Sequence, residues 1–444
     1  MKRFILLFGW LVGASLSFAQ TFPTESLLNN GDRSKLINIV VLGDGYTAAQ
    51  QDQFRTDAQN ITNYLFSVTP FKEYKNYFNV DIVKVPSNQS GAKHPATATD
   101  VNEPVIPASN PDNYFGSTFD YANIHRLLVS TKYAAISSVL ASNFPDYDQV
   151  LIIVNSTEYG GSGGGNISTT SINASAFEIA VHELGHSFSA LSDEYWAGDV
   201  YARESANMTQ QTNPSLVKWK NWYGINSVGI FQHGTSGSQA LWYRPHQNCK
   251  MRFLGVNFCS VCREAIVEQI HNLASPITSF SPANSATLTA NSNLTFALST
   301  LKPVPNTLEI TWTLNGNSLV TNSDTYLLNT SSLTSGSNTL VAKVIDKTTL
   351  SKSDTHPTTH QYLVSWNIQY TPCPDAIVMA SPTDNLTAGS TTKKANKTVN
   401  AANKISGNAT NVIYRAGQAI TLEPGFTAEN TTVFTAEVKV NPCN

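Results

Sequence analysis

One stretch of the chain, FEIAVHELGHSFSALSDEYW at residues 177–196, limits its fold more than any other. His182 and His186 stand four residues apart, and Glu183 follows the first of them. On an α-helix such a pair lies on one face about one turn apart, so both imidazoles can reach the same ion. The neighbouring residues are mostly apolar, and unpaired polar side chains among them would be costly. We therefore predict a helix that presents a zinc site, with Glu183 placed to take a proton from a water on the metal.

The third zinc ligand does not follow from the helix itself. If the helix continued, Asp193 would lie about 10 Å beyond His186 along the axis, whereas a ligand must lie within about 2.0–2.2 Å of the ion. The chain must therefore turn back from Ser189 on, although serine tolerates a tight turn less readily than glycine. We prefer Asp193 over Glu194, because its shorter side chain lies nearest the turn, and Glu204 is a lesser candidate.

Strands that alternate with helices predict an α/β domain over residues 21–275. The segment at 35–50, KLINIVVLGDGYTAAQ, indicates a buried strand, a Gly-Asp-Gly turn and the start of a helix. Further strands are predicted at 77–86 and 148–156, the latter buried on both faces because of its run of Val, Leu and Ile.

Two helix starts carry the capping-box pattern, in which a Ser or Thr is followed three residues later by Glu or Gln. Thr47 and Gln50 form the first pair, and Ser175 and Glu178 form the second. The second pair predicts the beginning of the helix that carries the two histidines.

The character of the chain changes at residue 276. From 276 to 370 apolar and polar residues alternate between Asn-Gly-like turns, and Trp312 stands in one such run, which predicts an immunoglobulin-like β-sandwich. Residues 371–444 contain short, evenly spaced strand patterns and a Pro-Gly turn, and predict a small all-β module.

The first twenty residues, MKRFILLFGWLVGASLSFAQ, have the pattern of a secretory signal peptide. A basic start precedes an apolar run, and Ser17-Phe18-Ala19 fits a cleavage site. No later stretch is long enough to span a bilayer. We therefore expect a secreted or cell-surface protein without a membrane span.

Charge excludes one class of partner. Asp, Glu, Lys and Arg make up 13% of the chain, and the formal net charge is −3. Because Lys and Arg are scattered rather than clustered, nothing provides the positive surface of a nucleic-acid-binding protein.

Five cysteines fall into two groups. Cys373 and Cys443 bracket the last module and are expected to pair, since disulfides are the default in an exported chain. Among Cys249, Cys259 and Cys262 we favour one disulfide and one buried thiol. The alternative for these three, with His246 nearby, is a small structural metal site.

A glycine-rich stretch, GGSGG at 160–164, formally fits the Gly-x-Ser-x-Gly nucleophile elbow. That motif requires an immediate helix, whereas the helix expected here starts only near Ala176, so Ser162 is not predicted to be a nucleophile. We expect these glycines to form a flexible rim or loop beside a cleft.

Other polar residues give weaker signals. His233, Tyr243 and His246 are candidates for a cleft wall, and Tyr195 is a candidate for stabilising an oxyanion. Four further histidines have no partner pattern and are not assigned a role: His94, His125, His356 and His360.

Several motifs together resemble the secreted IgA metallopeptidase family of metzincin-like zinc endopeptidases. They are HELGHSFSALSDEYW, the upstream LGDGYT (42–47), GGSGGG (160–165) and YRPHQNCKMRFLGVNFCSVCREAI (243–266), and the resemblance covers about residues 37–270. The last segment resembles, more weakly, the coathanger-stack β modules of exported bacterial proteins.

The resemblance implies a zincin-like catalytic domain and assigns roles to five residues. His182, His186 and Asp193 would be the zinc ligands, Glu183 the general base, and Met251 the residue of the methionine turn below the metal. Ser189 departs from the glycine usual in such motifs, a departure that concerns the geometry of the turn rather than the ligand set.

These observations predict an exported zinc endopeptidase that acts on protein or peptide substrates through a zinc-bound water and Glu183. The alternative is a non-enzymatic surface adhesion protein with a structural zinc site, whose β modules bind a glycan or a cell-surface ligand. The presence of Glu183 argues against that alternative, because a closed structural site needs no base.

Overall fold

The structure, a computed structural model, describes residues 21–443, and the predicted signal peptide at 1–20 lies outside the described residues. The chain folds into two compact units. The first consists of the residues up to Pro276 with segments 301–308 and 346–361, and the second of 277–300, 309–345 and 362–444. The domain limits at residues 275 and 370 stay predictions.

A six-stranded sheet with the order β1-β3-β2-β6-β8-β7 forms the centre of the first unit. Its strands are β1 (Thr24–Leu28), β2 (Ile37–Asp44), β3 (Phe78–Val83), β6 (Gln149–Val154), β7 (Gly161–Gly164) and β8 (Ile167–Ser171). The inner four strands are parallel, and β1 and β7 are antiparallel edge strands. The three predicted strands are confirmed as β3, β2 and β6, which are neighbours in the sheet.

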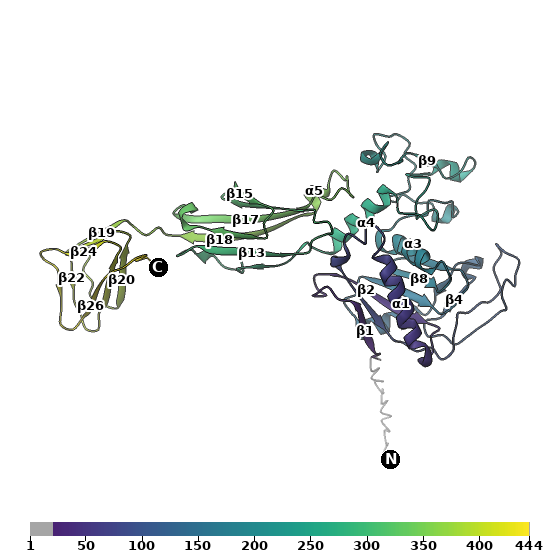
Figure 1. Cartoon of the computed structure of the whole chain (residues 1–444), viewed down its shortest axis with the longest axis horizontal. Coiled ribbons are helices and arrows are strands. Elements are labelled where there is room, and N and C mark those ends of the chain that lie inside the picture. The colour runs from purple at the N-terminus through teal and green to yellow at the C-terminus, as the bar shows by residue number, and fades with distance from the viewer. Residues whose placement is uncertain (1–20, 444) are drawn as a thin grey trace, which may run out of the picture. The chain divides into compact units, whose positions relative to one another are not determined.

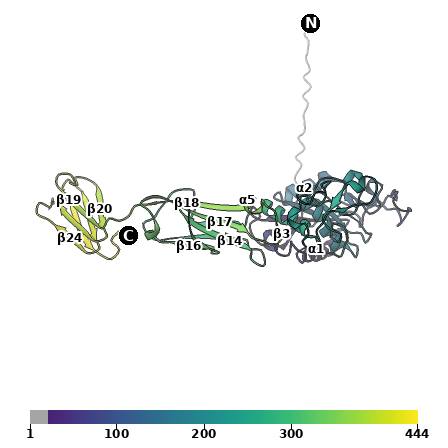
Figure 2. The ribbon, with the colours of Figure 1, turned by 90° about the horizontal axis from the view of Figure 1, so that it is seen from above.

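Helices cover both faces of this sheet. They are α1 (Gln51–Leu65), α3 (Ala176–Ser189) and α4 (Ser260–Leu273) on one face and α2 (Tyr133–Asn143) on the other. The short α5 (His356–Thr359) belongs to the same unit. Along β2, Ile39 and Val41 belong to the core shared with α1, α3 and α4, whereas Val40 and Leu42 belong to the core shared with α2. Figure 1 shows α1 and α3 over the same face, and Figure 2 shows α1 and α2 on opposite sides of β3. The predicted α/β architecture is therefore confirmed at the level of mixed helices and sheet.

Short elements complete the unit. The small strands are β4 (Ser117–Thr118) with β5 (Val129–Ser130), and β9 (Phe231–Gln232) with β10 (Tyr243–Arg244). The 3₁₀ helices are η1 (Ala48–Gln50), η2 (Lys75–Tyr77), η3 (Tyr121–Asn123), η4 (Asp199–Tyr201), η5 (Lys220–Trp222) and η6 (Ser238–Leu241). Within residues 21–443, no helix combines the length and apolar character needed to cross a membrane.

The two predicted capping boxes differ in outcome. The Thr47 N–H donates to Gln50 Oε1 at 3.1 Å, which confirms the first box ahead of α1. The second is wrong, because Ser175 caps no backbone N–H of α3 by its side chain. Glu178 instead binds Lys250 and Tyr64, so a tertiary ion pair takes the carboxylate that the local pattern assigns to the cap.

The glycine stretch is not the flexible loop that we predict from its composition. Residues 161–164 form β7, which pairs with β8. A Cβ atom on Gly163 would lie 2.4 Å from the carbonyl oxygen of Glu183, so glycine permits this strand to pack directly on α3. Ser162 Oγ donates to the Leu128 carbonyl oxygen at 2.6 Å, as expected of a structural serine.

Two sheets form the first part of the second unit. One has the order β11-β13-β16 and the other β12-β18-β17-β14-β15. Their bounds are β11 (Ile277–Ser281), β12 (Leu288–Thr289), β13 (Leu294–Thr300), β14 (Leu308–Leu314), β15 (Asn317–Thr321), β16 (Thr325–Leu328), β17 (Gly336–Asp346) and β18 (Gln361–Tyr370), with η7 (Thr330–Ser332). Trp312 on β14 is fully buried and stacks on Trp366, with ring centroids 5.8 Å apart.

The last module is a stacked coil of parallel strands. Its sheets have the orders β19-β21-β24, β20-β23-β26 and β22-β25. The strands are β19 (Ala376–Ala380), β20 (Ser390–Ala395), β21 (Thr398–Ala402), β22 (Lys404–Ile405), β23 (Asn411–Ala416), β24 (Ala419–Leu422), β25 (Thr427–Ala428) and β26 (Val433–Val438). Ala376 pairs with Thr398 and Thr398 with Ala419, so successive coils are offset by 398 − 376 = 22 and 419 − 398 = 21 residues. The sequence pattern correctly predicts short strands, but not that they run parallel.

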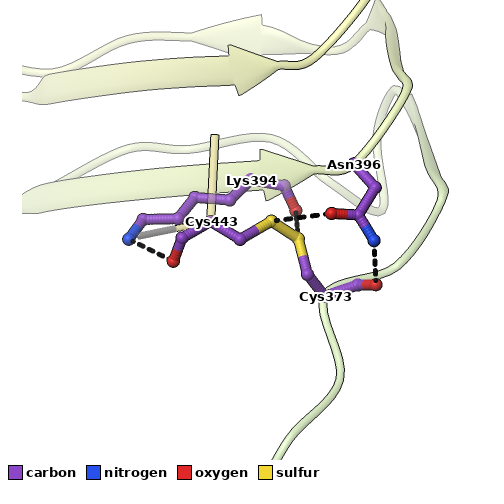
Figure 3. Close-up of a disulfide and its surroundings, with 4 residues drawn as sticks. All are labelled: Cys373, Lys394, Asn396 and Cys443. Atoms are coloured by element: carbon purple, nitrogen blue, oxygen red, sulfur yellow. Dashed lines mark hydrogen bonds between the residues drawn. A yellow bond between two sulfur atoms is a disulfide. The ribbon is translucent and has the colours of Figure 1, made fainter. Parts of the chain in front are cut away.

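A disulfide joins the two ends of this module. Cys373 and Cys443 are bonded, with their Cα atoms 6.1 Å apart, which confirms the predicted pair. Figure 3 shows Lys394 donating to the Cys443 carbonyl oxygen and Asn396 donating to that of Cys373.

Candidate active site

The imidazoles of His182 and His186 on α3 are both held through their Nδ1 atoms, so that their Nε2 atoms face each other. His182 Nδ1 lies 2.9 Å from the carbonyl oxygen of Lys250, and His186 Nδ1 lies 2.7 Å from that of Leu191. Because a carbonyl oxygen only accepts, each Nδ1 carries the proton and donates it. The two Nε2 atoms therefore remain for a shared ligand, and they lie 3.2 Å apart.

The chain reverses immediately after these histidines. Helix α3 ends at Ser189, and Ala190 adopts a left-handed conformation with φ of 52°. The Ala190 N–H donates to the His186 carbonyl oxygen, and the Leu191 N–H donates to that of Gly185. The turn that we predict from Ser189 on therefore has its left-handed residue one position later, at Ala190, where glycine would be the more usual residue.

This reversal brings Asp193 back to the two rings. Asp193 Oδ1 lies 3.2 Å from His182 Nε2 and 3.3 Å from His186 Nε2. Burial lowers the pKa of His186, but the hydrogen bond and charge of Asp193 outweigh burial and raise that pKa to about 9. Burial likewise opposes ionisation of Asp193, but the two imidazoles hold the pKa of its carboxyl below the ordinary value. The three atoms thus favour a positive charge between them, supplied either by a proton or by a metal ion.

The two alternative carboxylates are engaged elsewhere. Glu194 is fully buried, and its Oε1 faces Cys259 and Cys262. Glu204 forms an ion pair with Lys218 at 2.6 Å and accepts the Gln210 N–H. Of the three carboxylates that we consider from the sequence, only Asp193 has an ion-pair distance to either histidine.

Glu183 lies beside the same point. Its carboxylate and the ring nitrogens of His182 and His186 all lie within 4.8 Å of one another. Burial raises the pKa of the Glu183 carboxyl, an effect that the charges of the two histidines oppose. A Cβ atom on Gly161 would lie 3.2 Å from Glu183 Oε1, so β7 forms one wall next to this carboxylate.

Met251 supports the helix from below. A Cβ atom on Gly185 would lie 2.7 Å from Met251 Sδ, so the glycine between the two histidines lets this fully buried methionine approach the helix backbone. The Glu194 N–H donates to the Met251 carbonyl oxygen at 2.7 Å. The residue that the family resemblance names for the methionine turn therefore packs directly on α3.

Arg126 is a neighbour of the site that no sequence motif indicates. Its Nη2 donates to the Tyr195 hydroxyl at 3.2 Å, and its guanidinium lies 5.2 Å from the centre of the Tyr195 ring. The pKa of Tyr195 is raised by burial and by the charge of Asp193, so the phenol keeps its proton and can donate it in a hydrogen bond.

The candidate cleft-wall residues lie in different surroundings. The His233 ring packs edge-on against Trp196, and burial lowers the pKa of His233 to about 4, so this ring is neutral. His246 accepts the Asn248 N–H within a turn, and Tyr243 pairs with Gln232 in the small sheet of β9 and β10. The structure assigns His246 and Tyr243 to local structure rather than to the histidine pair.

Three further groups of side chains that could bind a metal occur among the described residues. Each group contains residues that are distant in the sequence and that only the fold brings together. They are His94, Glu103, Asp120 and His125; Glu268, His356 and His360; and Glu194, Cys249, Cys259 and Cys262. The second group is closed by internal contacts, since His356 and His360 each bind one oxygen of Glu268 at 2.7 and 3.0 Å.

The three cysteines of the last group are unpaired. The sulfur atoms of Cys249 and Cys262 are 3.6 Å apart, whereas a disulfide needs about 2.05 Å. The disulfide that we favour from the exported context is therefore wrong, because the fold places a carboxylate among the sulfurs instead of bringing two of them into bonding distance.

Comparison with known proteins gives a family match for the segment that contains this site. Residues 26–227 match the profile of the family described as IgA Peptidase M64, and the matched segment contains His182, Glu183, His186 and Asp193. A search among curated proteins gives no match. Over residues 26–227 this chain is therefore similar to the IgA Peptidase M64 family, a family of peptidases.

Proposed function

We propose that this protein is an exported zinc-dependent endopeptidase with a zincin-like catalytic domain. The observation that supports this proposal best is the convergence of His182, His186 and Asp193 on one point beside Glu183. The match of residues 26–227 to a peptidase family supports the substrate class, a protein or peptide chain.

The spacing of the three atoms fits zinc. Zinc bonds nitrogen and carboxylate oxygen at about 2.0–2.1 Å, and the edge of a tetrahedron with such bonds is about 3.3 Å. The three separations are 3.2 Å between the two Nε2 atoms and 3.2 and 3.3 Å from each to Asp193 Oδ1. Three protein ligands also leave the fourth position open, as in catalytic rather than structural zinc sites.

The side chains divide the chemistry among them. A zinc ion held by His182, His186 and Asp193 would polarise the substrate carbonyl and lower the pKa of a water towards about 7. Glu183 accepts the proton of the attacking water and then delivers it to the departing amine nitrogen. The carbonyls of Lys250 and Leu191 fix the two imidazoles by accepting their Nδ1 protons.

Arg126 and Tyr195 are our candidates for stabilising the charge that develops on the substrate oxygen. The Arg126 guanidinium is cationic, the Tyr195 hydroxyl is neutral, and the two are hydrogen-bonded next to Asp193. Donors in that position would act on the oxyanion without reorganising during the reaction.

The remaining parts of the proposal rest on the sequence pattern and the strand order. The signal-peptide pattern at 1–20 supports export. The two sheets of residues 277–370 support an immunoglobulin-like sandwich, as do the buried Trp312 and Trp366, which stack on each other and both belong to the five-stranded sheet. A glycan or cell-surface ligand for the β modules stays a prediction.

Digestion of an unfolded protein tests the proposed activity. The purified protein is expected to cut casein at internal peptide bonds, to lose this activity when a chelator removes zinc, and to regain it on addition of zinc. Mass spectrometry of the products identifies the bonds. If the zinc-loaded protein leaves casein and a mixed cell extract uncut, the proposal is wrong and the surface-binding alternative is favoured.

The packing of β7 on α3 predicts a strong effect of a single methyl group. Gly163→Ala would push the Glu183 backbone away from the strand, and we expect a loss of about 1–3 kcal/mol in stability and of about tenfold or more in kcat/KM. Gly164→Ala is the matched control, because nothing lies within 4 Å of its Cβ position and its φ is not left-handed. Similar activity of the two variants would contradict the role assigned to the contact.

A further inference from the structure

A buried group of sulfur and oxygen atoms lies next to the proposed active site. Cys249 precedes Met251 by two residues, Glu194 follows Asp193, and Cys259 and Cys262 stand at the start of α4. The exposed fractions are 0% for Glu194, Cys249 and Cys262 and 4% for Cys259. One donor atom from each of the four residues lies within 4.8 Å of all the others.

The separations within this group fit a tetrahedral metal ion. Zinc bonds thiolate sulfur at about 2.3 Å and carboxylate oxygen at about 2.0–2.2 Å, which gives edges of about 3.8 Å between sulfurs and about 3.5 Å between sulfur and oxygen. Cys249 Sγ lies 3.6 Å from Cys262 Sγ, and Glu194 Oε1 lies 3.2 and 3.7 Å from the sulfurs of Cys262 and Cys259. Each distance is within a few tenths of an ångström of the expected edge.

Two features of the surroundings point to a bound cation. The Cys259 N–H donates to Cys249 Sγ at 3.2 Å, and Cys259 and Cys262 lie at the amino-terminal end of α4, where the helix dipole favours negative charge. Asn207 Nδ2 lies 3.4 Å from Glu194 Oε1, but Glu194 Oε2 is buried without a hydrogen-bond partner. A buried carboxylate in such a position is costly unless a cation compensates it.

We propose that Cys249, Cys259, Cys262 and Glu194 bind a second divalent metal ion, for which zinc is the best fit. Three thiolates select a soft or borderline ion, and four protein ligands leave no open position, so the site would be structural rather than catalytic. The proposal of a second ion does not rest on the proposed peptidase activity, since none of its four ligands is His182, His186 or Asp193.

A metal ion bound by these four residues would link three segments of the chain. Glu194 is adjacent to Asp193, and its N–H donates to the carbonyl oxygen of Met251, which lies under α3. An ion bound here joins the segment after α3, the segment around Met251 and the start of α4. It would hold Asp193 at the proposed catalytic site as a positioning device.

Cobalt(II) distinguishes the two sites without reference to activity. The wild-type protein is stripped of metal in the presence of a reductant and reloaded with cobalt under anaerobic conditions. We expect a near-ultraviolet sulfur-to-cobalt charge-transfer band, which the nitrogen and oxygen ligands of the histidine site cannot produce. The wild-type spectrum alone decides, so the test does not depend on a variant that folds.

Variants then show which residues give rise to the charge-transfer band and bind the second zinc ion. Cys262→Ser is expected to abolish the band and to bind one zinc equivalent fewer than wild type, whereas His186→Ala is expected to keep the band. Glu194→Gln should weaken zinc binding at this site, and Glu204→Gln, an exposed carboxylate ten residues on, is its matched control.

Two results would overturn the proposal. One is a wild-type protein without a charge-transfer band. The other is a thiol titration of the unfolded, unreduced and metal-free protein that finds one free thiol instead of three, since this would show a disulfide among Cys249, Cys259 and Cys262.

Discussion

Glu183→Gln is expected to lower kcat/KM on casein by about 10²–10⁴-fold, the usual contribution of a general acid–base residue. Glutamine keeps the size and polarity of the side chain but cannot accept the proton of the attacking water. Because Glu183 is not among the three proposed ligands, the zinc content should equal that of wild type.

The control for this variant is Glu204→Gln. Glu204 is a carboxylate of the same unit, but it pairs with Lys218 and accepts hydrogen bonds from Thr209 and Gln210. We expect its activity to stay within about twofold of wild type, as for a surface substitution away from the site. If Glu183→Gln cleaves casein as fast as wild type while binding the same amount of zinc, the assigned role of Glu183 is wrong.

Asp193→Ala is expected to abolish activity and to weaken zinc binding at the histidine site by more than about 100-fold. Loss of a residue that only orients a ligand costs about 10–100-fold in affinity, and loss of a ligand should cost more. The substitution also removes the negative charge that raises the pKa of His186 and that would compensate the charge of a bound cation.

Zinc titration followed by metal analysis measures this effect. The zinc equivalent assigned to the cysteine group should remain, so the variant is expected to lose one equivalent and not all bound metal. Normal zinc binding by Asp193→Ala, together with loss of zinc in Glu204→Ala, would show that the ligand choice is wrong.

The central strands could be predicted from the sequence because a strand that is buried on both faces consists mainly of consecutive apolar residues. β2, β3 and β6 are buried on both faces, so continuous apolar runs report them directly. The same holds for α3, whose histidine spacing has meaning only on a helix. The position of Asp193 also follows from simple geometry, because a continuing helix would carry every later ligand out of reach.

Other features depend on contacts between distant segments. Residues 161–164, which are Ser162 and three glycines, form a strand because they pair with β8 and because Gly161 and Gly163 can pack against α3 without a Cβ atom. The Glu178 carboxylate binds Lys250, 72 residues away in the chain, and does not form the capping box expected from the sequence. Neither partner can be inferred from the residues adjacent to the motif.

The groups of metal-binding side chains illustrate the same limit. His94 and His125 come together through the loops that follow β3, with ring centroids 5.2 Å apart, although 31 residues separate them. Arg126 reaches Tyr195 across 69 residues and belongs to no motif. In the last module the strands are evident from alternation, but strand direction leaves no local pattern, so the parallel coil is visible only in the pairing.

Anomalous X-ray scattering at the zinc absorption edge tests the central claim most directly. Crystals of the zinc-loaded wild-type protein are expected to show a peak within about 2.0–2.2 Å of His182 Nε2, His186 Nε2 and an Asp193 carboxylate oxygen. A map without a peak at this point, or with a peak that Glu204 and not Asp193 ligates, would contradict the account.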